Sequence, residues 1–306
     1  AGVDENNVEQ VLEDIIKAGA DIIFCVGPQM MPNSLKVAVE HPEVYILNCS
    51  LNAPHPYIRT YYGRMYEAKF LAGMIAGAVT DNERVAYIAD YPIYGMIANI
   101  NAFALGVASV NPRAKVYLAW SKTKDYDRNK FLTENDLHYV SDQDIITPND
   151  ASRYFGLYKL QDGQALNLAM PIWNWGVFYE KLLQSVLAGS YKAEGQEQVK
   201  ALNYWWGMSA GVIDLICSKH VPYGVKRLAD HLKSDITKGE VVPFFGQIYD
   251  QKGELKNKGE HEMKPSDIMK MDWLVDNVVG SIPPMSEFVD NAKMVVELKG
   301  VEENKL

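Results

Sequence analysis

YIRTYYGRMYEAKFLAGMIAGAVTDNE, residues 57–83, decides the fold, because it separates two runs of alternating strands and helices. It begins with a short predicted strand, and its apolar stretch FLAGMIAGAV, residues 70–79, is typical of a buried helix. The polar TDNE ends that helix, and RVAYIAD, residues 84–90, starts a new strand. This restart after residue 81 predicts a second α/β lobe.

The chain before this stretch alternates helix and strand. NVEQVLEDIIKAGA, residues 7–20, has apolar residues at helical spacing. DIIFCVG, residues 21–27, is apolar enough for a strand buried on both faces, and EVYILNCS, residues 43–50, follows a further helix as the next strand. Such βα repetition predicts a parallel sheet with helices on both faces.

The pattern continues after residue 84 and then becomes less regular. We expect strands over 114–120 and 137–143 and a helix over 177–189. VVPFFGQIYDQKGEL, residues 241–255, predicts a hairpin with its tip at DQKG. PSDIMKMDWLVDNVVG, residues 265–280, is interpreted as a closing helix.

Composition bounds the class of protein. At 306 residues the chain is long for one core, so two domains are expected. A net charge of -9 argues against a nucleic-acid partner, because a duplex-binding protein needs a basic face to neutralise phosphates. No apolar run reaches the 18 or so residues of a membrane span, and no Lys/Arg cluster indicates an anionic membrane surface.

Motifs for phosphate, metal and nucleophile chemistry are missing from the sequence. Neither G-x-G-x-x-G nor G-x-x-x-x-G-K-[ST] occurs, nor H-E-x-x-H or G-x-S-x-G. The acidic SDQD, residues 141–144, could hold Mg²⁺ or act as acid and base, accept hydrogen bonds from a ligand, or cap a helix. We therefore expect a protein that is not an enzyme and uses no cofactor or metal.

Aromatic, amide and carboxylate side chains recur where predicted strands end. In open α/β sheets ligands bind beyond the carboxyl ends of the strands. Such residues suit a flat ring that stacks between aromatic faces while polar groups address its edge. The candidate ligand-binding residues are Gln29, Asn48, Asp90, Tyr91, Asp142, Gln143, Tyr158, Trp173, Asn174 and Trp175. Trp173 and Tyr91 are the expected stacking faces, and Asp142, Asn174 and Gln29 are expected at the ring edge.

Several of these segments resemble a known family. Three segments are similar to the basic membrane protein family. They are the Glu followed shortly by FLAG in the opening stretch, HPEVYILN after ADIIFCVG, and WNWGVFYEKLLQSVLAGSYK at residues 173–192. These are substrate-binding lipoproteins of nucleoside-type ABC importers, related to the purine nucleoside receptor of spirochaetes. The resemblance covers most of the chain, including YWWGMSAGVIDLI and PFFGQIYDQKGEL.

The resemblance implies a type I periplasmic-binding-protein fold, an α/β fold with two doubly wound lobes joined by three crossovers. Lobe 1 would comprise residues 1–80 with 176–210, and lobe 2 residues 81–175 with 211–306. The implied protein is extracytoplasmic, periplasmic or on the cell surface, and closes on a purine base or nucleoside in the cleft between its lobes. Its implied partner is an ABC transporter permease, with membrane attachment only through a lipid anchor outside this sequence.

Two departures from the family carry further expectations. Relatives begin with a strand and a ligand-contacting loop, so we expect an N-terminal stretch beyond the residues given. Nucleoside-binding relatives carry a Lys near the position of Trp173, suited to sugar hydroxyls. The Trp removes that donor and adds a stacking face, which favours a free base such as adenine over a nucleoside.

Two alternatives remain at this point. A nucleoside hydrolase could use the carboxylates of Asp142 and Asp144, although such an enzyme typically holds Ca²⁺ through several clustered Asp residues. A ligand-sensing domain of a signalling or transcription protein could be built on the same fold. Product release from a nucleoside would identify the hydrolase, and a helix-turn-helix or membrane segment in the complete gene would identify the sensor.

Overall fold

The computed structural model describes residues 3, 7–51, 57–144, 153–190 and 204–299. The chain forms two compact units. Unit 1 comprises Ala1–Gly63 and Trp175–Trp206, and unit 2 comprises Arg64–Asn174 and Gly207–Leu306. The chain therefore passes between the units three times.

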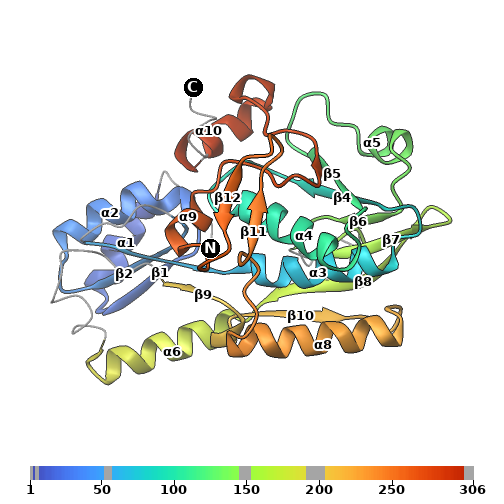
Figure 1. Cartoon of the computed structure of the whole chain (residues 1–306). Helices are drawn as coiled ribbons and strands as arrows, with labels where there is room; N and C mark the ends of the chain where they lie inside the picture. The colour runs from blue at the N-terminus through green and yellow to red at the C-terminus, as the bar shows by residue number, and fades with distance from the viewer. Residues whose placement is uncertain (1–2, 4–6, 52–56, 145–152, 191–203, 300–306) are drawn as a thin grey trace. The chain divides into compact units, whose positions relative to one another are not determined.

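Unit 1 is built on a four-stranded parallel sheet with the strand order β1-β2-β3-β9 (Figure 1). The strands are β1 (Ile22–Cys25), β2 (Tyr45–Cys49), β3 (Arg59–Gly63) and β9 (Tyr204–Trp206). Its helices are α1 (Val8–Lys17), α2 (Met31–Glu40) and α6 (Trp175–Leu187), with a short 3₁₀ turn η1 (Pro28–Met30) before α2.

Strand alternation sends the side chains of unit 1 into two different cores. Ile23 and Cys25 of β1 pack with apolar residues of α1 and α2, including Leu12 and Val37. Phe24 points to the opposite face, because successive side chains of a strand alternate. There its ring contacts Tyr179 of α6, with ring centroids 4.7 Å apart. The sheet is thus covered on both faces, as a parallel sheet requires.

Unit 2 contains a seven-stranded mixed sheet with the order β10-β8-β7-β6-β4-β5-β13. The strands are β4 (Arg84–Ala89), β5 (Lys115–Trp120), β6 (Tyr139–Ser141), β7 (Leu157–Gln161), β8 (Gln164–Trp173), β10 (Ile213–Cys217) and β13 (Val278–Val279). Strands β4, β5, β6 and β13 run parallel, whereas β7 is antiparallel to both β6 and β8. Strand β10 is antiparallel to β8.

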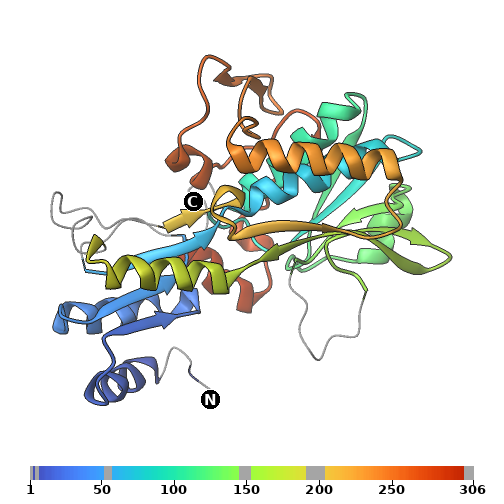
Figure 2. The ribbon, with the colours of Figure 1, turned by 90° about the horizontal axis from the view of Figure 1, so that it is seen from below.

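The helices of unit 2 lie on both faces of this sheet. They are α3 (Met65–Val79), α4 (Met96–Val110), α5 (Arg128–Glu134), α8 (Tyr223–Lys238), α9 (Pro265–Met269) and α10 (Asp290–Lys299), with 3₁₀ turns η2 (Met208–Ala210) and η3 (Met285–Glu287). Helices α3 and α4 pack against each other, and α8 runs beside α3 (Figure 2). On the other face, α5 covers Ala86 and Ile88 of β4 through Leu132.

Helices α3 and α4 approach closely because glycines line their contact. An ideal Cβ placed on Gly73 would lie 2.0 Å from the carbonyl oxygen of Phe103, and one on Gly106 would lie 2.0 Å from that of Phe70. Only glycine lets the two backbones come this near without displacing one of them. The helix predicted from FLAGMIAGAV is therefore buried against its neighbour along most of its length.

Three features differ from the sequence-based expectations. Residues 64–80 group with unit 2, and not with the first lobe, because α3 packs on α4 and α8. Residues 265–280 form only the short helix α9, followed by loop and β13. Tyr158 is the second residue of β7, so it lies near the start of its strand and not at its end. The predicted hairpin is present as β11 (Gln247–Tyr249) and β12 (Leu255–Lys258).

Candidate ligand-binding site

One edge of the unit 2 sheet gathers most of the predicted site residues. Because β7 is antiparallel to both β6 and β8, β8 runs in the same direction as β6 and β4. Asp90 follows β4, Asp142 follows β6, and Trp173 ends β8, so all three lie at carboxyl ends on the same side of the sheet. This is the side at which open α/β sheets bind ligands.

Asp142 is held by groups from three directions. Its Oδ2 lies 3.2 Å from Nη2 of Arg128 and accepts a hydrogen bond of 3.0 Å from the Tyr158 hydroxyl. Its Oδ1 accepts one of 2.9 Å from the backbone N–H of Gln143. Burial raises the pKa of the Asp142 carboxyl above its ordinary value, while Arg128 and Tyr158 oppose the shift. The carboxylate is thus preorganised as a hydrogen-bond acceptor.

Tyr158 links this carboxylate to the neighbouring helix. Its side chain is fully buried on β7, and its hydroxyl accepts a hydrogen bond from Nη2 of Arg128 while donating to Asp142. The guanidinium of Arg128 stacks over the ring of Tyr154 at 3.9 Å. Its buried Nε–H has no hydrogen-bond partner among the described residues. The structure therefore makes Tyr158 a support for Asp142.

Asp144 is paired with a lysine from helix α3. Nζ of Lys69 lies 2.6 Å from Oδ1 of Asp144 and 3.1 Å from Oγ of Ser141. The Lys69 side chain is 1% exposed. Burial raises the pKa of the Asp144 carboxyl, and the nearby ammonium group opposes the shift. The ion pair therefore joins α3 to the end of β6.

Asp90 is the third carboxylate at this edge and has a neutral partner. Its Oδ1 accepts a hydrogen bond from Oγ of Ser121, which follows β5. Within the described part of the chain no cation pairs with it, and no group of three or more His, Cys, Asp or Glu side chains is arranged to hold a metal ion. Tyr91 beside it is half-buried, and Gln143 is exposed. Asp90 is thus available to accept a hydrogen bond from a ligand.

Trp173 and Asn174 lie where β8 leads into α6. Trp173 pairs with Ile213 of β10, and its buried indole Nε1 has no hydrogen-bond partner among the residues described. A buried unpaired N–H is uncommon in folded proteins and calls for an explanation. The Nδ2 of Asn174 donates to the carbonyl of Gly211 at 3.0 Å, so this amide is already used to hold the turn before β10.

The remaining three predicted residues belong to unit 1. Asn48 is fully buried, donates to the carbonyl of Gly27 at 3.0 Å and accepts from Ser50 at 2.7 Å. The ring of Trp175 packs on Tyr179, with centroids 6.4 Å apart and a 27° interplanar angle. Both side chains therefore have partners within unit 1, whereas Gln29 is exposed on the η1 turn.

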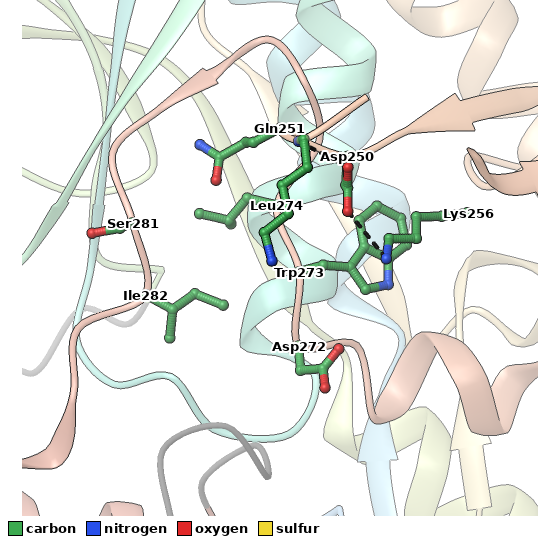
Figure 3. Close-up of a pocket in the computed structure, with 9 residues that line it drawn as sticks. Asp250, Gln251, Lys256, Asp272, Trp273, Leu274, Ser281 and Ile282 are labelled. Atoms are coloured by element: carbon green, nitrogen blue, oxygen red, sulfur yellow. Dashed lines mark hydrogen bonds and ion pairs between the residues drawn. The ribbon is translucent and has the colours of Figure 1, made fainter. Parts of the chain in front are cut away.

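A separate cavity of about 240 Å³ lies in unit 2, beside the turn of the β11–β12 hairpin (Figure 3). Figure 3 shows Lys256 directed at Asp250, and its Nζ lies 3.1 Å from Oδ2 of that residue. The same ammonium group lies 5.9 Å from the ring centroid of Trp273. None of the predicted site residues lines this cavity. The Lys256–Asp250 ion pair occupies part of its lining, and we do not take this cavity as the candidate site.

Two cations of the site were missed from the sequence. Lys69 carries a visible signal, since it is the single lysine in an otherwise apolar helical run, where only a paired charge is tolerated. Arg128 carries no such signal, because it lies in a polar segment whose pattern predicts an ordinary exposed helix. Their carboxylate partners depend on the folding of distant segments, which no local pattern reveals.

The comparison with protein families decides the identity. Residues 2–154 match the family model of PnrA-like ABC transporter substrate-binding proteins. The chain belongs to this family. The resemblance read from the sequence is confirmed, and PnrA-like proteins are transport proteins that bind a solute outside the cytoplasm for an ABC transporter in the membrane.

Two curated relatives extend over most of the PnrA-like chain. A purine-binding protein of Brucella abortus is 26% identical over 290 residues, which cover 90% of this chain and 81% of that protein. A putative ABC transporter glucose-binding protein of Haloferax volcanii is 30% identical over 217 residues, which cover 67% of this chain and 54% of that protein. The two names differ in the ligand, so they do not identify the ligand of this chain.

Solved structures share the fold. A solute-binding protein of an ABC transporter from Conexibacter woesei superposes with a TM-score of 0.54 at 17% identity, covering 78% of this chain and 84% of that one. A transcriptional activator of the comK gene from Bacillus halodurans reaches 0.57 at 15% identity, covering 79% and 87%. The predicted fold class is confirmed, and the second match shows that the same fold also occurs outside transport.

No helix in the described ranges is long and apolar enough to cross a membrane.

Proposed function

We propose that this PnrA-like protein binds a purine and favours the free base adenine. The observation that carries the proposal is the edge of the unit 2 sheet, where the acceptors Asp90 and Asp142 lie at the same side as Trp173. A purine offers N–H donors at its rim and flat faces for an aromatic ring. The purine-binding name of the Brucella abortus relative supports the same ligand class.

The proposed roles follow the chemistry of each side chain. Trp173 and Tyr91 stack on the ring faces. Asp142 accepts a hydrogen bond from the ring edge, and Asp90 is placed to accept another. Gln29 is a further proposed contact at the ring edge.

Calorimetric titration of the purified protein with adenine, adenosine and glucose tests this proposal. We expect adenine to bind more tightly than adenosine and glucose to give no heat of binding. Clearly tighter binding of adenosine would refute the preference for a free base, and binding of glucose alone would refute the purine class. Mass spectrometry of small molecules released by denaturation gives an independent identification.

Asp142→Asn tests the site itself. The amide keeps the shape of the carboxylate but loses the charge-assisted hydrogen bond, so we expect a loss of about 1.5–3 kcal/mol in binding free energy. Asp162→Asn is the matched control, because Asp162 is exposed in the turn between β7 and β8. Equal affinities for the two variants would place the ligand away from this edge.

A further inference from the structure

Lys69 is a charged residue in an unusual environment. It lies on α3, whose buried side chains are otherwise apolar apart from Glu67, and its own side chain is 1% exposed. Its ammonium group lies 5.0 Å from the ring centroid of Tyr87 on β4. Burying a charge costs several kcal/mol unless it is paired and hydrogen-bonded. The contacts of Lys69 are therefore specific requirements of this position.

The two hydrogen-bond partners of Lys69 lie three residues apart in sequence. Nζ donates to Ser141, the last residue of β6, and to Asp144, three residues later, at 3.1 and 2.6 Å. Asp142 and Gln143 lie between these two attachment points. The lysine thus ties both ends of the 141–144 segment to helix α3.

The same segment is held from the opposite face of the sheet. Tyr87 points toward α4, where its ring contacts Phe103, so Lys69 approaches from the α3–α4 face. Arg128 comes from α5, which covers the other face, and pairs with Asp142 at 3.2 Å. Arg128 therefore fixes Asp142 directly, whereas Lys69 fixes it through the two ends of the 141–144 segment.

We propose that Lys69 is a positioning residue for ligand binding, which fixes Asp142 and Gln143 through Ser141 and Asp144 without touching the ligand. The inference rests on the proposed function, in which Asp142 accepts a hydrogen bond from the ring edge. A plain structural role is the competing explanation, because Lys69 also neutralises the buried carboxylate of Asp144. The two roles are separated by removing both charges together.

The experiment compares Lys69→Met with the double variant Lys69→Met/Asp144→Asn. The single variant leaves a buried carboxylate unpaired and can lose stability for that reason alone. The double variant removes both charges of this ion pair and with them the tie between α3 and residues 141–144. Lys115→Met is the matched control, because Lys115 is exposed at the amino end of β5.

Two measurements are made on each protein. Hydrogen–deuterium exchange without ligand reports how firmly residues 139–144 are held, with peptides from α4 as the internal reference. We expect faster exchange in this segment for the double variant and unchanged exchange in α4. Calorimetry with adenine reports the effect of the double variant on affinity. We expect the affinity to fall about tenfold, which corresponds to the loss of roughly one hydrogen bond to a charged group.

The outcomes are distinct. A double variant with wild-type exchange and wild-type affinity would show that Lys69 only neutralises Asp144, and would overturn the proposal. Faster exchange with unchanged affinity would overturn it as well, because the segment would then not matter for binding. If the wild type gives no heat with adenine while the double variant still exchanges faster, the proposed function fails and the tie by Lys69 is supported.

Discussion

Glu67 is a buried carboxylate of unit 2 with specific partners. Glu67, at the start of α3, accepts a 2.6 Å hydrogen bond from the backbone N–H of Met208 and lies 3.9 Å from Nη1 of Arg64. Its carboxylate rests against Gly207, where an added Cβ would lie 2.2 Å from Oε2. The carboxylate therefore ties the start of α3 to the residues that follow the third passage of the chain between the units.

The pKa of Glu67 predicts a pH dependence of stability. Burial raises the pKa of this carboxyl, although the Met208 N–H and Arg64 oppose the shift. A carboxyl with a raised folded-state pKa binds its proton more readily in the folded than in the unfolded protein. Its contribution to the free energy of unfolding therefore falls as the pH rises from about 4.3 through the raised pKa.

Glu67→Gln removes this titration. Urea unfolding of both proteins between pH 4.5 and 7 should show the free energy of unfolding of the wild type falling relative to that of the variant as the pH rises. Parallel curves would contradict the assignment, and so would a wild type that gains stability over the variant with rising pH.

At the scale of elements, the close contact between α3 and α4 depends on glycines, which carry no side chain. Gly73→Ala places a methyl group into the Phe103 carbonyl, which must move. We expect a loss of about 1–3 kcal/mol in the free energy of unfolding, despite the better helix propensity of alanine. Gly224→Ala on α8 is the control, because a Cβ there meets no atom within 4 Å. Urea unfolding should show it unchanged or slightly stabilised.

The segment predicted as a closing helix shows how a tertiary contact overrides a local pattern. Asn101 on α4 is fully buried and donates to the carbonyl of Trp273 at 2.7 Å, while its Oδ1 accepts from the N–H of Val275 at 3.0 Å. These backbone groups would bond within the segment if it were helical. The asparagine instead holds a non-helical segment whose side chains Leu274 and Val275 are buried.

Asn101→Leu tests this explanation. The substitution leaves a buried carbonyl and a buried N–H unpaired, so thermal unfolding should show a loss of at least about 2 kcal/mol. Asn99→Leu, two positions earlier on the same helix, should change the stability by less than about 1 kcal/mol. A similar effect of both substitutions would mean that burial of leucine, and not the lost hydrogen bonds, determines the result.

At the scale of the whole molecule, the chain passes three times between its two units, after Gly63, Asn174 and Trp206. We expect adenine to raise the temperature of thermal unfolding as its concentration increases, because a ligand that binds only the folded protein stabilises it by mass action. An unfolding temperature that does not change with adenine would contradict the proposed binding. Glucose, expected not to bind, is the control.

Much of the fold was predictable because its signals are local. The helix at 70–79, the strand at 84–90 and the hairpin at 241–255 follow from apolar spacing and turn residues, which short-range geometry determines. The sequence also predicted that polar residues follow several apolar strands, which is where open α/β sheets bind ligands. The family was recognisable because these local patterns occur together in one order.

The sequence by itself determined the α/β class, the restart after residue 81 and the family. Only the tertiary structure decided that α3 belongs to unit 2, that residues 270–277 are not helical, and that Lys69 and Arg128 hold the carboxylates at the sheet edge. The physical reason is the distance along the chain over which each interaction acts. Periodicity acts over a few residues, whereas the partner of a buried charge or amide lies 14 to 174 positions away, and the free energy of burial selects it only after the chain has folded.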